Sequence, residues 1–218
     1  MEREEINKEI DWLMGSIKRS CTQLKTEFII LMVAVFIGVV IGGFYTVFGG
    51  DSSHIGMTVL LLFLGLLAIL VVSFVAHKRL VRAETPQEML AIYDRMWIIR
   101  SALWVALIGG SFFFVDGSLF SKICLMLAVA MLAVTNWLDM NNKLRPWVGI
   151  VLLLVESALL YYSQVDLLAG LLVLLLMLLI IAGQKMLLIF GPNHCGDDMV
   201  VQTEMEIKKL RELVKRIE

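Results

Sequence analysis

Two long runs without charge constrain this chain more than any other feature. Between Phe28 and Phe48 the only ionisable side chain is the phenol of Tyr45, and residues 55–76 carry none. At about 1.5 Å per residue, a helix over either run is long enough to cross the ~30 Å hydrocarbon core of a bilayer. The composition agrees, because 59% of the 218 residues are hydrophobic, only 18% are charged and the mean hydropathy is +0.85. We therefore expect an integral membrane protein.

Four further apolar segments extend this pattern. The six expected spans cover residues 28–48, 55–76, 98–115, 119–138, 146–164 and 165–190. The third and fourth hold Arg100 and Lys122 near their ends, from where long basic side chains can reach the headgroups. Each span must be helical, because lipid offers its backbone no hydrogen-bond partners. The sequence thus predicts an all-α fold: a polytopic membrane bundle of six transmembrane helices, arranged as three hairpins.

The basic residues predict the orientation. Of the nineteen Lys and Arg residues, five precede residue 28, five lie between Lys78 and Arg100, two at 143–145 and six from 185 onward. All eighteen fall on one side of a six-span arrangement, and only Lys122 lies on the other. Cytoplasmic loops carry such an excess, so we expect both termini in the cytoplasm. The opposite loops are short and contain no Asn-x-Ser/Thr sequence, which fits a bacterial inner (plasma) membrane.

A short pattern recurs where each odd-numbered span ends. The segments are IGGFYTVFGGD (41–51), IGGSFFFVDGS (108–118) and VESALLYYSQVD (155–166). Each runs from small or polar residues, through aromatic residues, to an acidic turn. The repeat favours three similar hairpins around an axis along the membrane normal. Chance resemblance between apolar helices that end in Gly/Asp turns explains the pattern equally well.

The segments outside the spans predict amphipathic cytoplasmic helices. Residues 1–27 place apolar residues three and four apart, and a shorter helix is expected at about 85–97, with Thr85 as N-cap and Glu88 closing a capping box. Residues 191–218 form the third segment, after a Gly-Pro break. Its apolar stripe, a candidate partner-binding face of coiled-coil type, comprises Ile207, Leu210, Val214 and Ile217. Such stripes require a partner: each other, the membrane surface, a second copy or another protein.

Glu156 is the one acidic residue in the middle of an expected span, since Asp166 lies at the very start of the sixth. It lies ten residues after Pro146, roughly 15 Å along a helix, and hence near the bilayer midplane. An ionised carboxylate facing lipid at that depth costs about 2.5–3.5 kcal/mol or more, so the side chain should face the bundle.

Two readings of Glu156 remain open. With Ser157 it is a candidate intramembrane ion or proton site, in a channel or a proton- or cation-coupled transporter. Alternatively it is structural, hydrogen-bonded to a neighbouring helix through Thr46, Ser111 or Thr135. The sequence offers no second acid or base at the same depth, which weakens the transport reading.

Small residues mark expected close contacts between helices. Gly38 and Gly42 form a GxxxG motif, which permits two helix backbones to approach each other. The candidate helix-packing positions are Gly38, Gly42, Gly43, Gly109 and Gly110. Packing within one chain and packing between copies are both compatible with this pattern.

No sequence pattern points to catalysis. Zinc-helix, nucleophile-elbow, phosphate-loop and dinucleotide-binding motifs are absent from the sequence. Neighbouring His194 and Cys195 lack the spacing of a zinc site, so we expect neither metal nor cofactor. Basic residues outside the spans are mixed with acidic ones, which argues against nucleic acid.

The expected organisation is therefore a cytoplasmic helix (1–27), a membrane domain (28–190) and a cytoplasmic helix (191–218). We expect a non-enzymatic protein whose cytoplasmic helices serve a regulatory or scaffolding role. Its partners would be the lipid bilayer and a second copy or a cytoplasmic protein. A small channel or transporter built on Glu156 is the alternative.

Overall fold

The structure, a computed structural model, describes residues 2–50, 53–114, 118–140, 146–163 and 196–217. Every element in these ranges is an α-helix and none is a strand, which confirms the all-α fold class. The helices are α1 (Glu2–Phe48), α2 (Ser53–Arg82), α3 (Pro86–Phe114), α4 (Leu119–Met140), α5 (Pro146–Ser163) and α7 (Gly196–Ile217). The sixth expected span, and with it His194 and Cys195, lies outside the described residues.

Three helices are long and apolar enough to cross a membrane. They cover Arg3–Phe48, Gly56–Arg82 and Pro86–Phe114, and α4 holds a shorter apolar stretch over Leu119–Thr135. The expected cytoplasmic segments at 1–27 and 85–97 are not separate helices, because each continues without a break into an apolar run. No proline interrupts α1, and the only proline in α3 is its first residue, where the missing N–H costs nothing.

The beginning of α3 follows the predicted capping box. The backbone N–H of Glu88 donates to Thr85 Oγ1 at 3.2 Å. The Glu88 carboxylate accepts from the backbone N–H of Glu84 at 2.9 Å, one residue before the position that the motif predicts. These bonds fix the turn in which α2 ends and α3 begins.

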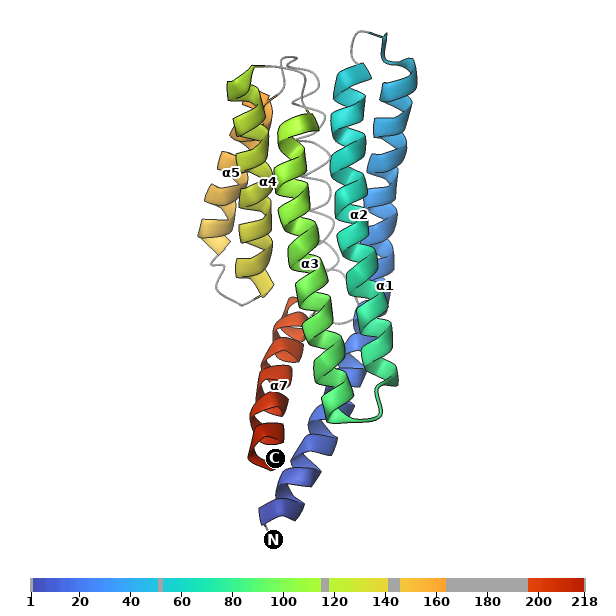
Figure 1. Ribbon diagram of the computed structural model, residues 1–218, viewed down its shortest axis with the longest axis vertical. Helices are drawn as coiled ribbons and strands as arrows, with labels where there is room; N and C mark the ends of the chain where they lie inside the picture. Colours follow the sequence, from blue (N-terminus) through green and yellow to red (C-terminus); the bar gives the residue numbers. More distant parts are fainter. Residues whose placement is uncertain (1, 51–52, 115–117, 141–145, 164–195, 218) are drawn as a thin grey trace.

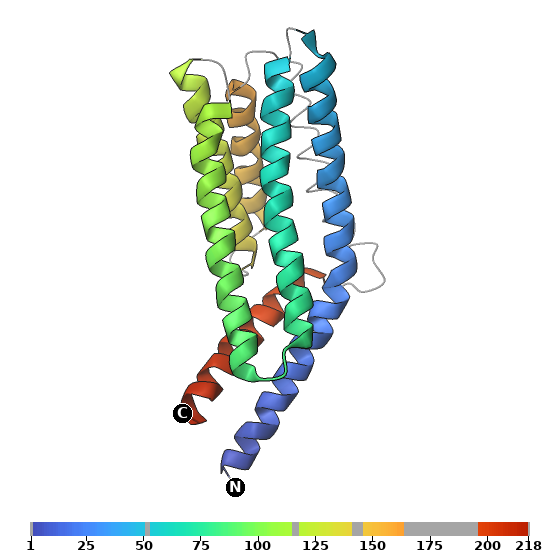
Figure 2. The same ribbon diagram turned by 45° about the vertical axis from the view of Figure 1, so that its right-hand side comes forward.

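The helices run up and down beside one another, and both chain ends lie at the same end of the bundle (Figure 1). Consecutive helices pack in pairs, α1 on α2, α2 on α3, α3 on α4 and α4 on α5. Helix α7 crosses the lower parts of α1 and α3, as the turned view shows (Figure 2). The N-terminal half of α1 and the C-terminal helix therefore meet although they are far apart in the sequence.

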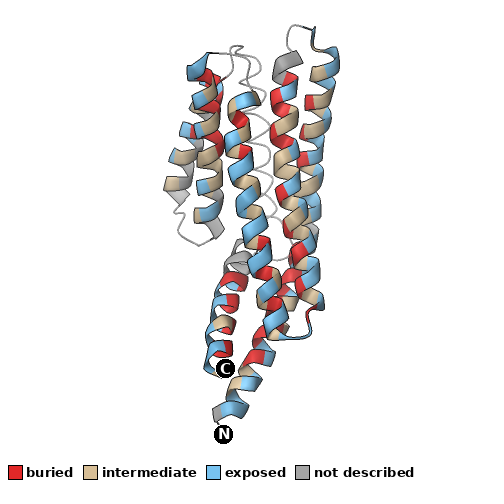
Figure 3. Ribbon diagram, in the orientation of Figure 1, coloured by how far each residue is buried: buried red, intermediate tan, exposed pale blue. Residues whose placement is uncertain are grey.

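Two separate cores hold this arrangement, and the buried positions of each face the neighbouring helices (Figure 3). The upper cluster joins α1–α5 and consists of Val35, Val59, Leu62, Phe63, Ile69, Leu107, Leu125, Ala128, Val129 and Leu160. Around it, large apolar side chains such as Val33, Phe36 and Val105 are exposed. Exposed apolar faces of this extent are expected on helices that lie in lipid.

The lower cluster lies where α1, α2, α3 and α7 meet, and of its buried residues only Ala76 belongs to one of the two long uncharged runs. Its buried residues are Ile10, Leu13, Met14, Ile17, Cys21, Ala76, Leu80, Ala83, Met89, Tyr93, Met96, Ile207, Leu210, Leu213 and Val214. The buried α7 residues recur three and four apart, so one face of that helix is covered and the other is exposed.

Candidate functional site

The face of α7 that the sequence marked for partner binding packs inside the chain. Ile207, Leu210 and Val214 are buried in the lower cluster, and Ile217 is partly buried against it. The sequence left four partners open for this stripe: the other helices of the chain, the membrane surface, a second copy or another protein. In the described residues, α1, α2 and α3 of the same chain cover it. Any partner of this part of the chain therefore meets α7 in its docked position or has to displace it.

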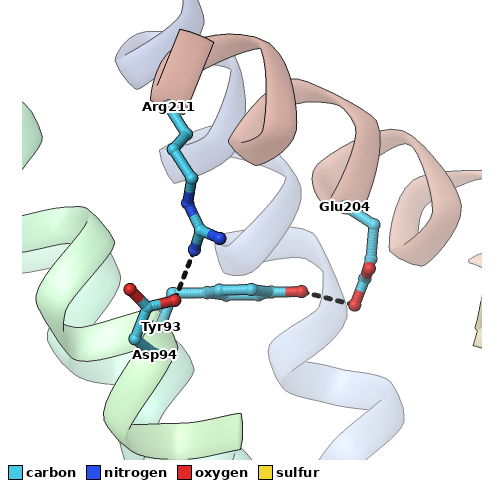
Figure 4. A network of polar contacts seen from close by, with 4 residues as sticks. All are labelled: Tyr93, Asp94, Glu204 and Arg211. Carbon is cyan, nitrogen blue, oxygen red and sulfur yellow. Dashed lines mark hydrogen bonds and ion pairs between the residues drawn. The ribbon is translucent and has the colours of Figure 1, made fainter. Parts of the chain in front are cut away.

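Two carboxylates of α7 are buried beneath it. Glu204 accepts a hydrogen bond from the hydroxyl of Tyr93 on α3, at 2.5 Å (Figure 4). Glu206 Oε1 accepts from the hydroxyl of Ser16 on α1 at 2.7 Å, and from the side-chain amide of Gln202 at 2.9 Å. Buried carboxylates are costly without such donors, so these hydroxyls are part of what allows α7 to pack here.

Ion pairs lie at the rim of the same interface. Lys209 of α7 contacts Glu9 of α1 at 2.6 Å, and Arg211 of α7 pairs with Asp94 of α3 (Figure 4). All four side chains are partly exposed, so the pairs set the register of α7 more than they stabilise it.

The environment of this interface raises the pKa values of two neutral groups. Burial, and secondarily the charge of Glu206, raises the pKa of the Cys21 thiol to about 12. Burial, followed by the hydrogen bond to Glu204, raises the pKa of the Tyr93 hydroxyl well above its usual value. Both shifts favour the neutral forms of the two groups while α7 is docked.

Sequence reasoning missed these polar contacts. The apolar stripe of α7 indicated which face is buried, and Glu204 and Glu206 lie on the same face as Ile207. Their place on the apolar face could have predicted that these two acids are buried. Their partners, Ser16 and Tyr93, are more than 100 residues away in the chain. Only the fold brings them together.

Glu156 lies on α5 and is 7% exposed. Its Oε1 accepts a hydrogen bond from the Thr135 hydroxyl of α4 at 2.7 Å, so the carboxyl faces a neighbouring helix. The other two partners that the structural reading named are engaged elsewhere: Thr46 donates to the carbonyl of Gly42, and Ser111 to that of Ile108. The side chain of Ser157 lies outside the described residues.

The glycines divide into two groups. A Cβ on Gly42 would lie 2.6 Å from the backbone N of Leu60, and one on Gly38 would lie 2.2 Å from the ring of Phe63, so both are at the α1–α2 contact. A Cβ on Gly110 would meet only the ring of Phe114, at 3.2 Å. Gly43 and Gly109 have no described atom within 4 Å of such a position.

Both basic residues near the ends of expected spans lie over aromatic rings. The guanidinium carbon of Arg100 is 5.8 Å from the ring centre of Trp97, and Lys122 Nζ is 5.7 Å from that of Phe112. A cation over an aromatic face is stabilised by the ring quadrupole.

Among the residues that the structure describes, no three His, Cys, Asp or Glu side chains gather as a metal site would require. The chain matches no protein-family model, no curated protein and no solved structure. Its function therefore has to be argued from its own residues.

Proposed function

We propose that this chain is a six-span membrane protein whose ends form a cytoplasmic helical platform, with a non-enzymatic, regulatory or scaffolding role. The observation that carries the proposal is the lower cluster, a second packed core that lies almost entirely outside the two long uncharged runs. Both chain ends and the α2–α3 turn build it. The excess of Lys and Arg on that side favours a cytoplasmic position, and short loops favour a bacterial inner membrane.

The surface of the platform offers a candidate contact. Trp12 on α1 is 58% exposed, although tryptophan is a large and mostly apolar side chain. Met205 on α7 is similarly exposed. The ion pair between Lys209 and Glu9 joins the two helices at one level. Met205 lies one turn before Lys209, and Trp12 lies one turn after Glu9. The two apolar side chains therefore lie at a common level beside the α1–α7 contact. Tryptophan is among the residues that contribute most to protein interfaces.

Photo-crosslinking in the native membrane tests the scaffolding role. The full chain carries a photoreactive amino acid in place of Trp12, and a matched variant carries it in place of Ile99, which is exposed on the apolar part of α3. We expect a discrete protein adduct at position 12 and lipid adducts at position 99. Protein adducts absent from position 12, or equal at both positions, would contradict the role.

A transport function is the second candidate, because Glu156 is a buried carboxyl with a single hydrogen-bond donor among the described residues. Replacing Glu156 with Gln keeps an oxygen for the Thr135 hydroxyl but removes the ionisable group. If the chain transports protons or cations, purified protein in vesicles shows a pH-dependent flux that Glu156→Gln abolishes. No flux in the wild type, or the same flux in the variant, excludes this candidate.

A further inference from the structure

The exposed side of the α1–α2 pair changes from apolar to basic at one level. The ring of Phe28 on α1 contacts that of His77 on α2, with ring centres 4.8 Å apart, so the two residues mark the same height of the bundle. Lys25 lies three residues before Phe28 and Lys78 directly follows His77, and both lysines are exposed. The two long uncharged runs stop within one residue of this contact. In the proposed topology, the hydrocarbon therefore gives way to lipid headgroups at this height.

Lys25 and Lys78 lie on the same flank of the helix pair. At about 100° per residue, Lys25 lies about 60° round α1 from Phe28, and Lys78 lies about 100° round α2 from His77, in the same sense along each chain. The two helices run antiparallel, so turns in the same sense past their contact lead to one side of the pair (Figure 1). Arg82 lies one turn after Lys78 on the same face of α2 and is exposed. We call Lys25, Lys78 and Arg82 the basic flank.

Exposed apolar side chains lie directly above the basic flank. Ile29 lies one turn after Lys25 in α1, and Val75 lies one turn before Lys78 in α2. Val71 lies one turn above Val75, and all three apolar side chains are exposed. This surface is thus apolar at the height of the hydrocarbon and basic at the height of the headgroups, which matches the two parts of an anionic phospholipid.

The charges of the basic flank are not balanced by acidic side chains. In the described part of the chain none of its three residues lies in an ion pair, whereas Lys8, Lys209 and Arg211 of the platform each pair with a carboxylate. Helix α2 contains no acid at all. The acid nearest to Lys25 in the sequence, at position 27, lies about 200° round α1 and so on its other side. Three cations without acidic partners favour an anion as the ligand of this flank.

We propose that the basic flank binds the headgroup of an anionic phospholipid of the cytoplasmic leaflet, with the acyl chains lying along Ile29, Val71 and Val75. The phosphate oxygens accept hydrogen bonds from the ammonium and guanidinium groups. A soluble phosphate would use only these basic groups, whereas a lipid also covers the apolar side chains above them. This inference rests on the proposed membrane topology and adds a lipid ligand to it.

Lipid retention by the purified full chain in neutral detergent tests this site. Phosphatidylglycerol, which is anionic, and zwitterionic phosphatidylcholine with the same acyl chains are added in turn, and native mass spectrometry counts the lipids that each protein molecule retains. We expect preferential retention of phosphatidylglycerol. An equal concentration of glycerol phosphate should not displace it, because that soluble anion lacks acyl chains. Equal retention of the two lipids, or displacement by glycerol phosphate, would overturn the proposal.

A variant without the basic flank carries Lys25→Gln, Lys78→Gln and Arg82→Gln. One basic residue near a membrane surface contributes about a fivefold factor in affinity for anionic lipid, so we expect the three substitutions to weaken phosphatidylglycerol binding at least about tenfold. All three side chains are exposed, so the substitutions leave the buried clusters intact.

The matched control loses three charges from α7 instead, through Lys208→Gln, Lys215→Gln and Arg216→Gln, all at exposed positions. It should bind phosphatidylglycerol as the wild type does, and equal losses in the two variants would overturn the site. The wild type alone gives a second readout in case the first variant is poorly recovered. Its melting temperature should rise with phosphatidylglycerol and not with phosphatidylcholine, and equal melting temperatures would also overturn the proposal. Failure of this site is distinct from failure of the proposed function, because a platform without the lipid still gives a protein adduct at position 12.

Discussion

The hydrogen bond from Thr135 to Glu156 is the observation that most favours a structural role for this buried carboxyl. The 2.7 Å hydrogen bond joins α4 to α5 in the apolar part of the bundle. Removing the hydroxyl by Thr135→Val leaves a buried carboxyl without this donor, and we expect a loss of about 1–3 kcal/mol in the free energy of unfolding. Thermal or denaturant unfolding in detergent measures it.

Thr46→Val is the matched control for this prediction. Thr46 donates to the carbonyl of Gly42 in its own helix, which already accepts within the helix, so its loss should cost little. Equal effects of the two substitutions would mean that the α4–α5 bond does not contribute to stability.

We expect Cys21 and Tyr93 to make the stability of the folded chain fall at alkaline pH. Their ordinary pKa values are 9.0 and 10.0, and in the folded chain the pKa of Cys21 is raised to about 12 and that of Tyr93 is raised as well. A raised folded pKa favours the neutral form, so this stability is fully present below about pH 9 and is lost as the pH rises toward 12. For Cys21 alone the loss begins near pH 9 and is complete near pH 12.

The melting temperature should therefore fall between pH 9 and pH 12. A Cys21→Ala, Tyr93→Phe double variant should show a shallower fall over the same range, because it lacks both titrating groups. The same slope in wild type and variant would assign the alkaline sensitivity to other residues.

At the scale of elements, the α1–α2 contact depends on Gly42. A Cβ there would lie 2.6 Å from backbone N of Leu60, and backbone cannot rotate away as a side chain can. We expect Gly42→Ala to destabilise the protein by about 1–3 kcal/mol through separation of the two helices. Gly43→Ala, where no described atom lies within 4 Å, should be neutral or stabilising by up to about 1 kcal/mol. Unfolding measurements that rank the two variants the other way would contradict this packing.

Docking of α7 depends on Leu210, which is completely buried. An aspartate there places an uncompensated charge in the lower cluster, which costs about 3 kcal/mol or more. We expect Leu210→Asp to raise the rate of Cys21 labelling roughly a hundredfold, measured with the other native cysteines replaced.

Met205→Asp is the control for the same helix, because Met205 is exposed on the opposite face. Cys21 in this variant should be labelled at nearly the wild-type rate. Fast labelling of Cys21 in Met205→Asp would mean that a new charge on either face of α7 undocks the helix. Its buried face would then not be what holds it in place.

Helix-forming runs, the α3 cap and the buried stripe of α7 follow from spacing along the chain, because each is a local property. The sequence offered three hydroxyl residues as examples of a partner for Glu156, and the packing of α4 on α5 places Thr135 beside it. Tyr93 and Ser16 could not be predicted as partners of Glu204 and Glu206, because no local pattern relates residues so far apart.

In the whole molecule, the proposed topology depends on which ends of the helices share a side of the membrane. The lower cluster requires the N-terminal half of α1, the α2–α3 turn and α7 to lie together. The beginning of α4 lies at the other end of the bundle (Figure 1). Exposed positions at both ends are suitable for labels.

Two-sided cysteine labelling measures on which side of the membrane each end of the bundle lies. Single cysteines replace Asn7, Glu212 or Ser118, all exposed, in a chain without native cysteines, and a membrane-impermeant reagent is applied to vesicles of each orientation. We expect positions 7 and 212 to react only from the cytoplasmic side and position 118 only from the opposite side. Labelling of positions 7 and 212 from different sides, or of all three from one side, would contradict the proposed topology.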